Sequence, residues 1–500
     1  MNKLVKGALA LVWLPIATAA HSDTLRDVYE LALSNDPILK SAEATFRADS
    51  EQEIIARSAF LPQIQGSIYE TDVESDRDAI AITQTNTGIG GSPQFGQQPT
   101  NTVTETDTEG YSVSLNQALF NMPAWFNFQS GRKLTAKAQY ELEAAQQDLI
   151  VRVAEAYFNV LRARDNLEAS RAEERATLRQ LEQAQQRYDV GLIAITDVHE
   201  ARASYDSTVV RRLTDEGSVG TAMESLQVIT NQSHGPLWAL SKDFPVKSPE
   251  PAARSEWVDF ALANNKQLLA AQHGSEASLE SARAARYEHL PQLSASYQYT
   301  EEELEGTTRS NPASTFATNP DSESETEVIS INLEVPIFSG GRVSAQRRRA
   351  WEQYNSAREQ TTFLERDTIR ATRAQHIAVA TDVARVKARK QAIVSTQSAL
   401  DATSAGYEVG TRNVVDVLNS QRALYASIRD YANARYDYVI NLLKLKRQAG
   451  ILSPQDIFDL NAYLVKSGPV SVNGGIPEAP KPRPQPKAKP TTGQQRPMSF

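Results

Sequence analysis

The sequence predicts a mainly α-helical protein with four short strands, built from two copies of one unit. Three observations predict this fold. Long segments without proline carry apolar residues at helical spacing, four segments alternate polar and apolar residues, and the same motifs occur twice in the same order. Only 40% of the residues are hydrophobic and 7% are aromatic, which suits long helices that each bury a narrow stripe.

The first twenty residues have the pattern of a secretory signal peptide. Lys3 and Lys6 supply the positive start, residues 8–16 are apolar, and Ala17-Thr18-Ala19 is a small-residue cleavage site. A transmembrane helix would need about 20 apolar residues, so we interpret residues 1–20 as a cleaved signal. No later segment resembles a membrane-spanning helix. The mature chain is therefore expected outside the cytoplasm, and any membrane crossing must use strands.

Composition argues against several classes of function. The net charge of −9 is unfavourable for general nucleic-acid binding. The absence of cysteine excludes disulfides, thiolate metal sites and a cysteine nucleophile. The six histidines show no metal-ligand spacing, and Gly88-Ile89-Gly90-Gly91 lacks the lysine of a phosphate-binding loop. We expect neither an enzyme nor a bound cofactor or metal.

The first repeat begins with a helix and two strands. Residues 24–58 have helical periodicity, residues 63–69 alternate, a polar acidic loop is expected up to about Gly110, and residues 111–116 alternate again. No proline occurs from Ala124 to Gly235, where apolar residues step by three and four along a coiled-coil seam. A helix from Pro123 to Val190 would be roughly 100 Å long.

The second repeat follows the same order. Leu290-Pro291-Gln292 repeats Leu61-Pro62-Gln63, and Phe338 repeats Phe120 at a smaller offset because the second loop is shorter. The predicted parts of the chain are the signal peptide (1–20), first repeat (21–235), connector (236–254), second repeat (255–452), a segment expected to pack against the connector (453–466) and a disordered Pro-rich tail (467–500).

Each long helical segment is interrupted once by a Val-Gly pair. Val409-Gly410 lies between two helical runs, and Val190-Gly191 is its weaker copy in the first repeat. A helix reversal needs a residue that adopts positive φ, so both glycines are expected at hairpin turns. Asp197 and Asp416 follow these turns near helix starts, where an acidic residue is favoured by the helix dipole even without a function.

The four alternating segments have about the length of tilted membrane strands, although a half-buried soluble sheet would alternate as well. Four strands cannot close a barrel, and an open edge in hydrocarbon would leave backbone groups unpaired. Several copies must therefore share one barrel if the strands span a membrane. Two copies would give eight strands, which side chains fill, so a conducting pore favours three copies and twelve strands.

The chain resembles the TolC family of outer-membrane channel proteins over residues 23–465. The resemblance is clearest in four segments: residues 407–418 (Tyr-Glu-Val-Gly-Thr-Arg-Asn-Val-Val-Asp-Val-Leu), 191–198, 432–438 and 156–161. It implies a homotrimer with long antiparallel coiled-coil helices that form an α-barrel tunnel in the periplasm, and a small β-barrel with four strands per protomer in the outer-membrane lipid. It implies no enzymatic chemistry.

In this family the hairpin turns form the periplasmic tip. The resemblance implies that Gly191, Gly410, Val190 and Val409 contact a periplasmic adaptor, which joins an inner-membrane pump or ABC transporter. The chain would then be the exit duct of a tripartite efflux pump, a type I secretion system, or both. A soluble periplasmic coiled-coil adaptor or spacer is the alternative, but it leaves the four alternating segments unexplained.

The resemblance also implies a gate and a cation-selective ring at the tip. Its gate residues match Tyr407 and Arg412 on the second hairpin and Thr196 and Asp197 on the first. The forked donors of Arg412 suit a carboxylate such as that of Asp197.

Asp416 is expected to project into the bore, where three copies would form an acidic ring that attracts cations. The family prototype has a second acidic residue one turn further on. Asn419 occupies that position here, which predicts weaker block by cations.

Overall fold

A computed structural model describes residues 23–85, 94–313 and 318–466. The predicted signal peptide, the Gly88-Ile89-Gly90-Gly91 segment and the predicted tail (467–500) lie outside the described residues. The chain divides into two compact units, and each unit contains residues from both sequence repeats. Unit 1 takes the described residues of Met1–Leu39, Gln146–Ala263 and Arg370–Phe500, and unit 2 takes those of Lys40–Ala145 and Asn264–Ile369.

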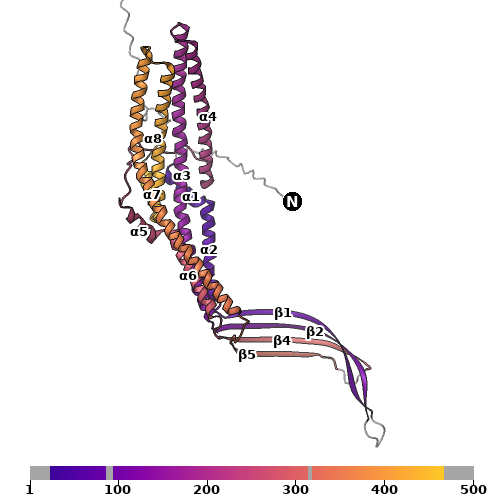
Figure 1. Cartoon of the computed structure of the whole chain (residues 1–500). Helices are drawn as coiled ribbons and strands as arrows, with labels where there is room; N and C mark the ends of the chain where they lie inside the picture. The colour runs from indigo at the N-terminus through magenta and orange to yellow at the C-terminus, as the bar shows by residue number, and fades with distance from the viewer. Residues whose placement is uncertain (1–22, 86–93, 314–317, 467–500) are drawn as a thin grey trace, which may run out of the picture. The chain divides into compact units, whose positions relative to one another are not determined.

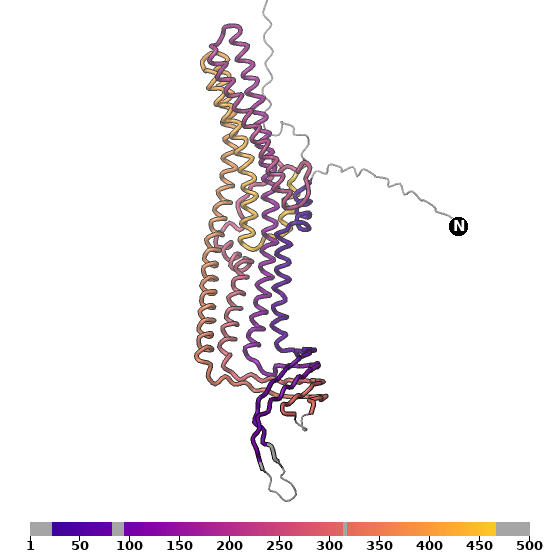
Figure 2. Tube along the Cα trace, turned by 90° about the vertical axis from the view of Figure 1, so that its right-hand side faces the viewer, coloured from indigo at the N-terminus to yellow at the C-terminus, as the bar shows by residue number. Residues whose placement is uncertain are grey.

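Two helical hairpins dominate unit 1. Their helices are α3 (Met122–Asp189) with α4 (Ile195–Thr230), and α7 (Arg342–Glu408) with α8 (Val414–Gln448), where α3 and α7 begin in unit 2. The two hairpins lie side by side with both turns at the same end of the unit (Figure 2). Aromatic contacts join them, since the ring of Phe158 on α3 lies 5.8 Å from that of Tyr436 on α8.

Short elements complete unit 1. The strands β3 (Ala239–Leu240) and β6 (Leu464–Val465) pair antiparallel, so the expected contact between the connector and the segment after residue 453 is present. The helices α1 (Leu25–Asn35), α5 (Arg254–Asn264) and α9 (Pro454–Asn461) lie near them in sequence. Trp257 of α5 is buried and donates a hydrogen bond to the Pro251 carbonyl at 2.8 Å.

The helix expected over residues 24–58 is broken into two. α1 ends at Asn35 and α2 spans Pro37–Ser58. Pro37 has no N–H to continue α1. Asp36 fills the gap, because its side chain accepts a hydrogen bond from the Leu39 N–H at 2.6 Å and two from Arg152 at 3.0 Å.

Unit 2 contains a four-stranded antiparallel sheet in its described part. Its strands are β1 (Gln63–Thr85), β2 (Gln94–Phe120), β4 (Gln292–Asn311) and β5 (Ser322–Glu334), in the order β1-β2-β4-β5 (Figure 1). Two helices of the unit, α2 and α6 (Lys266–Tyr287), precede the two pairs of strands. β1 and β5 are therefore the edges of the sheet.

The acidic segments were expected to be loops, and this expectation was wrong. β1 and β2 stay paired far beyond the predicted strands, with Glu70 opposite Glu109 and Asp72 opposite Asp107. β4 likewise stays paired with β2 up to Asn311. The charges suggested loop, but the threonines, valines and isoleucines among them favour strand, and each residue adds a pairing partner to a ladder that is already formed.

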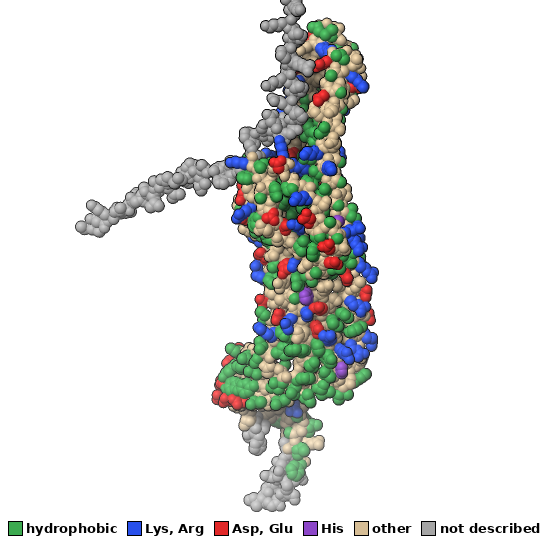
Figure 3. All heavy atoms as spheres, turned by 90° about the vertical axis from the view of Figure 1, so that its left-hand side faces the viewer, with side chains coloured by type: hydrophobic (Ala, Val, Ile, Leu, Met, Phe, Trp, Pro, Cys, Tyr) green, Lys and Arg blue, Asp and Glu red, His purple; other side chains and the backbone are tan. Residues whose placement is uncertain are grey.

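Apolar side chains of the sheet are exposed near the helices of unit 2. Ile68 is 91% exposed, Ile329 80% and Ile331 70%. Figure 3 shows hydrophobic side chains gathered over this part of the unit. Contiguous exposed apolar surface of this kind marks a binding or membrane surface. Among the described residues, no helix is both long and apolar enough to cross a bilayer.

Candidate functional site

The turn between α3 and α4 has the geometry predicted from its glycine. Gly191 adopts φ +76°, and its N–H donates to the Tyr188 carbonyl at 2.8 Å. The Leu192 N–H donates to the Arg187 carbonyl at 2.9 Å. This pair of bonds satisfies two carbonyls that the end of α3 would leave open.

The turn between α7 and α8 repeats that geometry. Gly410 adopts φ +80°, its N–H donates to the Tyr407 carbonyl at 3.2 Å, and the Thr411 N–H donates to the Gly406 carbonyl at 2.9 Å. Gly406, one turn before Gly410, also has little room for a side chain. A Cβ atom on this residue would lie 2.8 Å from Cγ of Arg412, so the stem of Arg412 rests where a larger residue would be.

Tyr407 is buried at the end of α7. It is 7% exposed and lies in a cluster with Val414, Val417 and Leu418 of α8. Its hydroxyl is buried without a hydrogen-bond partner among the described residues. The guanidinium carbon of Arg187 lies 4.7 Å from the centroid of the tyrosine ring, so α3 contacts α7 at this point.

The structure joins Arg412 to Asp416, not to Asp197. Nη1 of Arg412 lies 3.7 Å from a carboxylate oxygen of Asp416, which is in the first turn of α8. Both side chains are exposed, which makes this a weak pair worth about 0–1 kcal/mol. The side chain of Asn413 caps α8 by accepting a hydrogen bond from the Asp416 N–H at 2.8 Å. The pairing with Asp197 expected from the sequence is absent from the described residues.

Thr196 and Asp197 lie in the first turn of α4. Thr196 is exposed and Asp197 half-buried, and the Asp197 N–H donates to the Ala194 carbonyl at 3.1 Å. Ala194 is the N-cap and gives no side-chain cap, so the acidic residue favours this helix start through the dipole. Below it, Ala184, Val198 and Ala201 form the small core of this hairpin end.

Asn419 follows Asp416 on one face of α8. It is exposed, and its side-chain oxygen accepts a hydrogen bond from Arg422 at 3.3 Å. Each chain therefore presents one carboxylate on this face, with Arg412 on one side of it and Arg422 on the other.

The ends of both hairpins expose apolar side chains. Val409 is 75% exposed, Val190 69% and Leu192 68%. Apolar residues gathered at a turn have little local reason to face water, which makes this end of unit 1 a candidate contact surface for another protein.

A buried carboxylate that sequence reasoning missed joins the two hairpins. Glu173 of α3 is 1% exposed and accepts hydrogen bonds from Arg211 of α4 at 3.0 and 3.1 Å and from Arg429 of α8 at 3.0 Å. The available signal was its place on the coiled-coil seam. Ser170, Glu173 and Thr177 continue the spacing of the apolar residues before them and are all buried.

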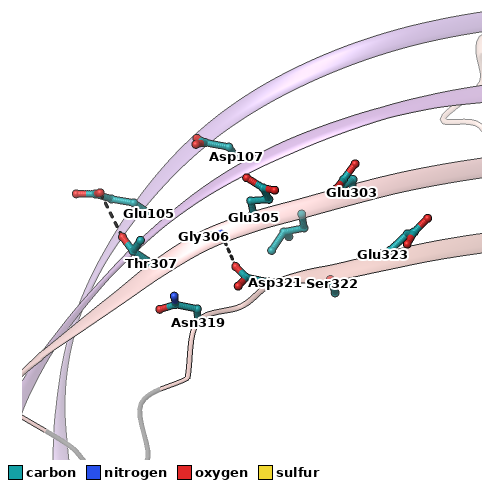
Figure 4. Close-up of a pocket in the computed structure, with 11 residues that line it drawn as sticks. Glu105, Asp107, Glu303, Glu305, Gly306, Thr307, Asn319, Asp321, Ser322 and Glu323 are labelled. Atoms are coloured by element: carbon teal, nitrogen blue, oxygen red, sulfur yellow. Dashed lines mark hydrogen bonds between the residues drawn. The ribbon is translucent and has the colours of Figure 1, made fainter.

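A separate acidic hollow of about 630 Å³ lies on the sheet of unit 2. Figure 4 shows carboxylates from three strands around it, with the Gly306 N–H donating to Asp321 at 2.9 Å. The lining acidic residues are Glu105, Asp107, Glu303, Glu305, Asp321 and Glu323. Among the described residues, no group of histidine, aspartate and glutamate side chains is arranged to hold a metal ion.

One protein-family model matches both repeats of the chain, including both helical hairpins. The model of the outer membrane efflux protein family matches residues 28–232 and 257–450, which are the two repeats. The chain belongs to the outer membrane efflux protein family. Outer membrane protein TolC of Vibrio cholerae is 33% identical over 93% of this chain and 99% of its own.

Two further comparisons support this membership. The alkaline protease secretion protein AprF of Pseudomonas aeruginosa is 26% identical over 91% of this chain and 90% of its own. The crystal structure of the outer membrane protein VceC from Vibrio cholerae shares the fold, with a TM-score of 0.65, 19% identity and coverage of 85% of this chain and 96% of that chain. The family's mainly helical fold with a small sheet is the fold of this protein.

Proposed function

We propose that this outer membrane efflux protein is the passive exit duct of an efflux pump or a type I secretion system. One observation carries the proposal. A single chain presents an exposed apolar face on a sheet with two open edges, together with two helical hairpins that end in apolar turns. Such a sheet fits lipid only when other copies cover its edges. The names of the relatives, an outer membrane protein and a protease secretion protein, support the same role.

Three copies are proposed to close a twelve-stranded barrel in the outer membrane and a helical tunnel in the periplasm. The exposed Val190, Leu192 and Val409 are proposed to meet a periplasmic adaptor that joins an inner-membrane pump or ABC transporter. The duct performs no catalysis in this scheme, and the pump supplies the energy. Drugs, metals, peptides and secreted proteins are all candidate cargo.

The hairpin ends are proposed to be a gate that a partner opens. The Arg412–Asp416 pair is exposed, and its contribution of about 0–1 kcal/mol is small compared with the energy available from docking a protein. In the assembled trimer, Arg412 is proposed to exchange Asp416 for Asp197 of a neighbouring copy, with Thr196 beside it. Tyr407 is proposed to hold the end of α7 through its buried ring.

The test combines location, assembly and conductance. Cell fractionation is expected to place the protein in the outer membrane as a heat-modifiable trimer. The purified trimer in a planar bilayer is expected to conduct, and deletion is expected to increase sensitivity to dyes, detergents and antibiotics or to remove proteins from the secretome. A soluble periplasmic monomer without conductance would contradict the proposal and support the spacer alternative.

A further inference from the structure

The two repeats correspond residue by residue in the structure. Gln63 of β1 lies opposite Asn116 of β2, and Gln292 of β4 lies opposite Glu334 of β5. Gln292 follows Gln63 at the offset of the two Leu-Pro-Gln motifs, and Glu334 follows Asn116 at the offset of Phe338 from Phe120. The helices agree, since the ends of α2 and α6 have the offset of the two Leu-Pro-Gln motifs, and the ends of α3 and α7 have the offset of the two Val-Gly pairs.

One joint between repeats is visible within the chain. It consists of β2 against β4, with Leu115 opposite Tyr297, and of α3 against α6. Nζ of Lys133 on α3 lies 2.8 Å from a carboxylate oxygen of Glu276 on α6. Beside this pair, the Ser130 hydroxyl donates to the Ala277 carbonyl at 3.0 Å, and both of these residues are buried.

The surfaces of α7 and α2 that correspond to this joint are exposed. The α7 residues correspond to those of α3 in the joint, and the α2 residues correspond to those of α6. Arg349 corresponds to the buried Ser130, and Ala48 corresponds to the buried Ala277. The exposed residues are Ala345, Arg349, Glu352 and Ser356 on α7, and Thr45, Arg47, Ala48 and Gln52 on α2.

The central ion pair of the joint has a counterpart with reversed charges. Lys133 corresponds to Glu352, and Glu276 corresponds to Arg47. The charge at each position is opposite to that of its counterpart, so a contact between Glu352 and Arg47 would again join unlike charges. Neither Glu352 nor Arg47 forms an ion pair within the described part of the chain, and Glu352 only accepts a hydrogen bond from Asn355 of its own helix.

In the proposed trimer, β5 and α7 of one copy adjoin β1 and α2 of the next copy. We propose that Glu352 forms an ion pair with Arg47 of the neighbouring copy across this joint. The register transferred from β2 and β4 places Leu333 opposite Ile68 of the neighbouring copy. This inference deepens the proposed trimer and rests on it. The occupant is a second copy because the surface continues a joint already seen within the chain. The contact joins two different surfaces, so it repeats from copy to copy until the ring closes.

Cysteine pairs test the contact without background, because the chain contains no cysteine. L333C/I68C is expected to give crosslinked dimers and trimers on mild oxidation, since a disulfide needs Cα atoms within about 7 Å and residues directly opposite on paired strands are closer than that. L115C/Y297C is the matched control and is expected to crosslink within one chain, because these two residues lie opposite each other on β2 and β4. L333C/E70C, displaced by two residues, is expected to crosslink poorly.

Charge reversal tests the ion pair. R47E and E352R are each expected to lower the temperature at which the trimer dissociates in detergent, and R47E/E352R is expected to restore it. R57E reverses an exposed charge elsewhere on α2 and is expected to leave it unchanged. A wild-type protein that is not oligomeric would refute the proposed trimer.

Stronger crosslinking of the trimer through L333C/E70C than through L333C/I68C would overturn this inference alone. So would an R47E/E352R trimer whose dissociation temperature stays as low as that of the single variants. Binding to anionic vesicles that R47E abolishes, without an L333C/I68C crosslink, would also overturn it.

Discussion

The guanidinium of Arg187 lies over the ring of Tyr407, with 4.7 Å between the guanidinium carbon and the ring centroid. Arg187 lies in the last turn of α3 and Tyr407 in the last turn of α7, so this contact joins the two hairpins close to their turns. A cation over an aromatic ring contributes about 0.5–1 kcal/mol at exposed sites and more where water is excluded. This cation–ring contact is one link between the two hairpins at this end of unit 1.

Tyr407 is expected to act through its ring and not through its hydroxyl within one chain. Y407F removes a buried hydroxyl that has no partner and should change the free energy of unfolding by less than about 0.5 kcal/mol. Y407A should cost about 3–5 kcal/mol, because it empties a buried aromatic site. Tyr188, the equivalent residue of the first hairpin, is 39% exposed, so Y188A is the control and should cost less. Thermal unfolding in detergent measures all three. A large effect of Y407F would show that the hydroxyl gains a partner in the assembled protein.

Glu173 is expected to be the most sensitive charged residue of unit 1. E173A leaves Arg211 and Arg429 facing each other without the carboxylate and should destabilise the protein by about 3 kcal/mol. E182A removes an exposed carboxylate of the same helix and should stay within about 0.5 kcal/mol. Replacing Glu173, Arg211 and Arg429 together by methionine should recover most of the loss. Equal effects of E173A and E182A in urea unfolding would refute this role.

Glycine substitutions should separate turns from helix interiors. G191A and G410A place a side chain at φ +76° and +80° and should each cost about 1–2 kcal/mol. G217A lies inside α4 with open space around it and should stabilise the protein by up to about 1 kcal/mol. Thermal unfolding distinguishes the signs, and a destabilising G217A would indicate that this face of α4 is covered in the assembly.

Asp165 makes the stability of unit 1 depend on pH. Burial raises the pKa of the Asp165 carboxyl above its ordinary value, and the hydrogen bond from the Tyr436 hydroxyl at 2.6 Å only partly opposes this. Between the ordinary pKa of this carboxyl in the unfolded chain and its higher pKa in the folded protein, the folded protein binds more protons. The free energy of unfolding therefore falls as pH rises through this window. D165N keeps an acceptor for Tyr436 and should be more stable than the wild type at pH 7 and less dependent on pH.

The control for that series is D206N, which changes an exposed acidic residue of α4. It should leave the pH profile of thermal unfolding as it is in the wild type. A D165N protein that is less stable than the wild type at pH 7 would show that the charge on Asp165 is compensated in the fold.

Local patterns were sufficient to predict the helices, the turns and the duplication. Gly191 and Gly410 predicted the turns between the helices, because only a residue without Cβ adopts their φ freely. The extended strands were missed because Glu70 and Asp72 resemble loop residues unless the partner strand is known. The break before Pro37 was missed as well, although a proline inside a helical pattern is a direct signal for one.

The site could be predicted only where the residues act locally. Position along the chain places Asp416 at a helix start, but it does not say that Arg412 prefers this neighbour at i+4 to Asp197 on the other hairpin. Glu173 and its two arginines come from three helices far apart in sequence, and no local pattern encodes their meeting. Contacts between distant segments depend on packing, which a single sequence does not display.

The single acidic residue at the tip predicts weak cation block. Asp416 is flanked by Arg412, and Asn419 stands where a second carboxylate would add to the field. In planar bilayers the wild-type channel should be blocked by trivalent cations less tightly than N419D, because three added carboxylates would form a second ring. D416N should remove most of the remaining block.

N413D alters the cap of α8 next to the proposed acidic ring. It serves as the control, since it adds charge while its side chain still accepts the capping bond from the Asp416 N–H. It should tighten block less than N419D does. Equal block of the wild type and N419D would mean that residue 419 does not face the bore.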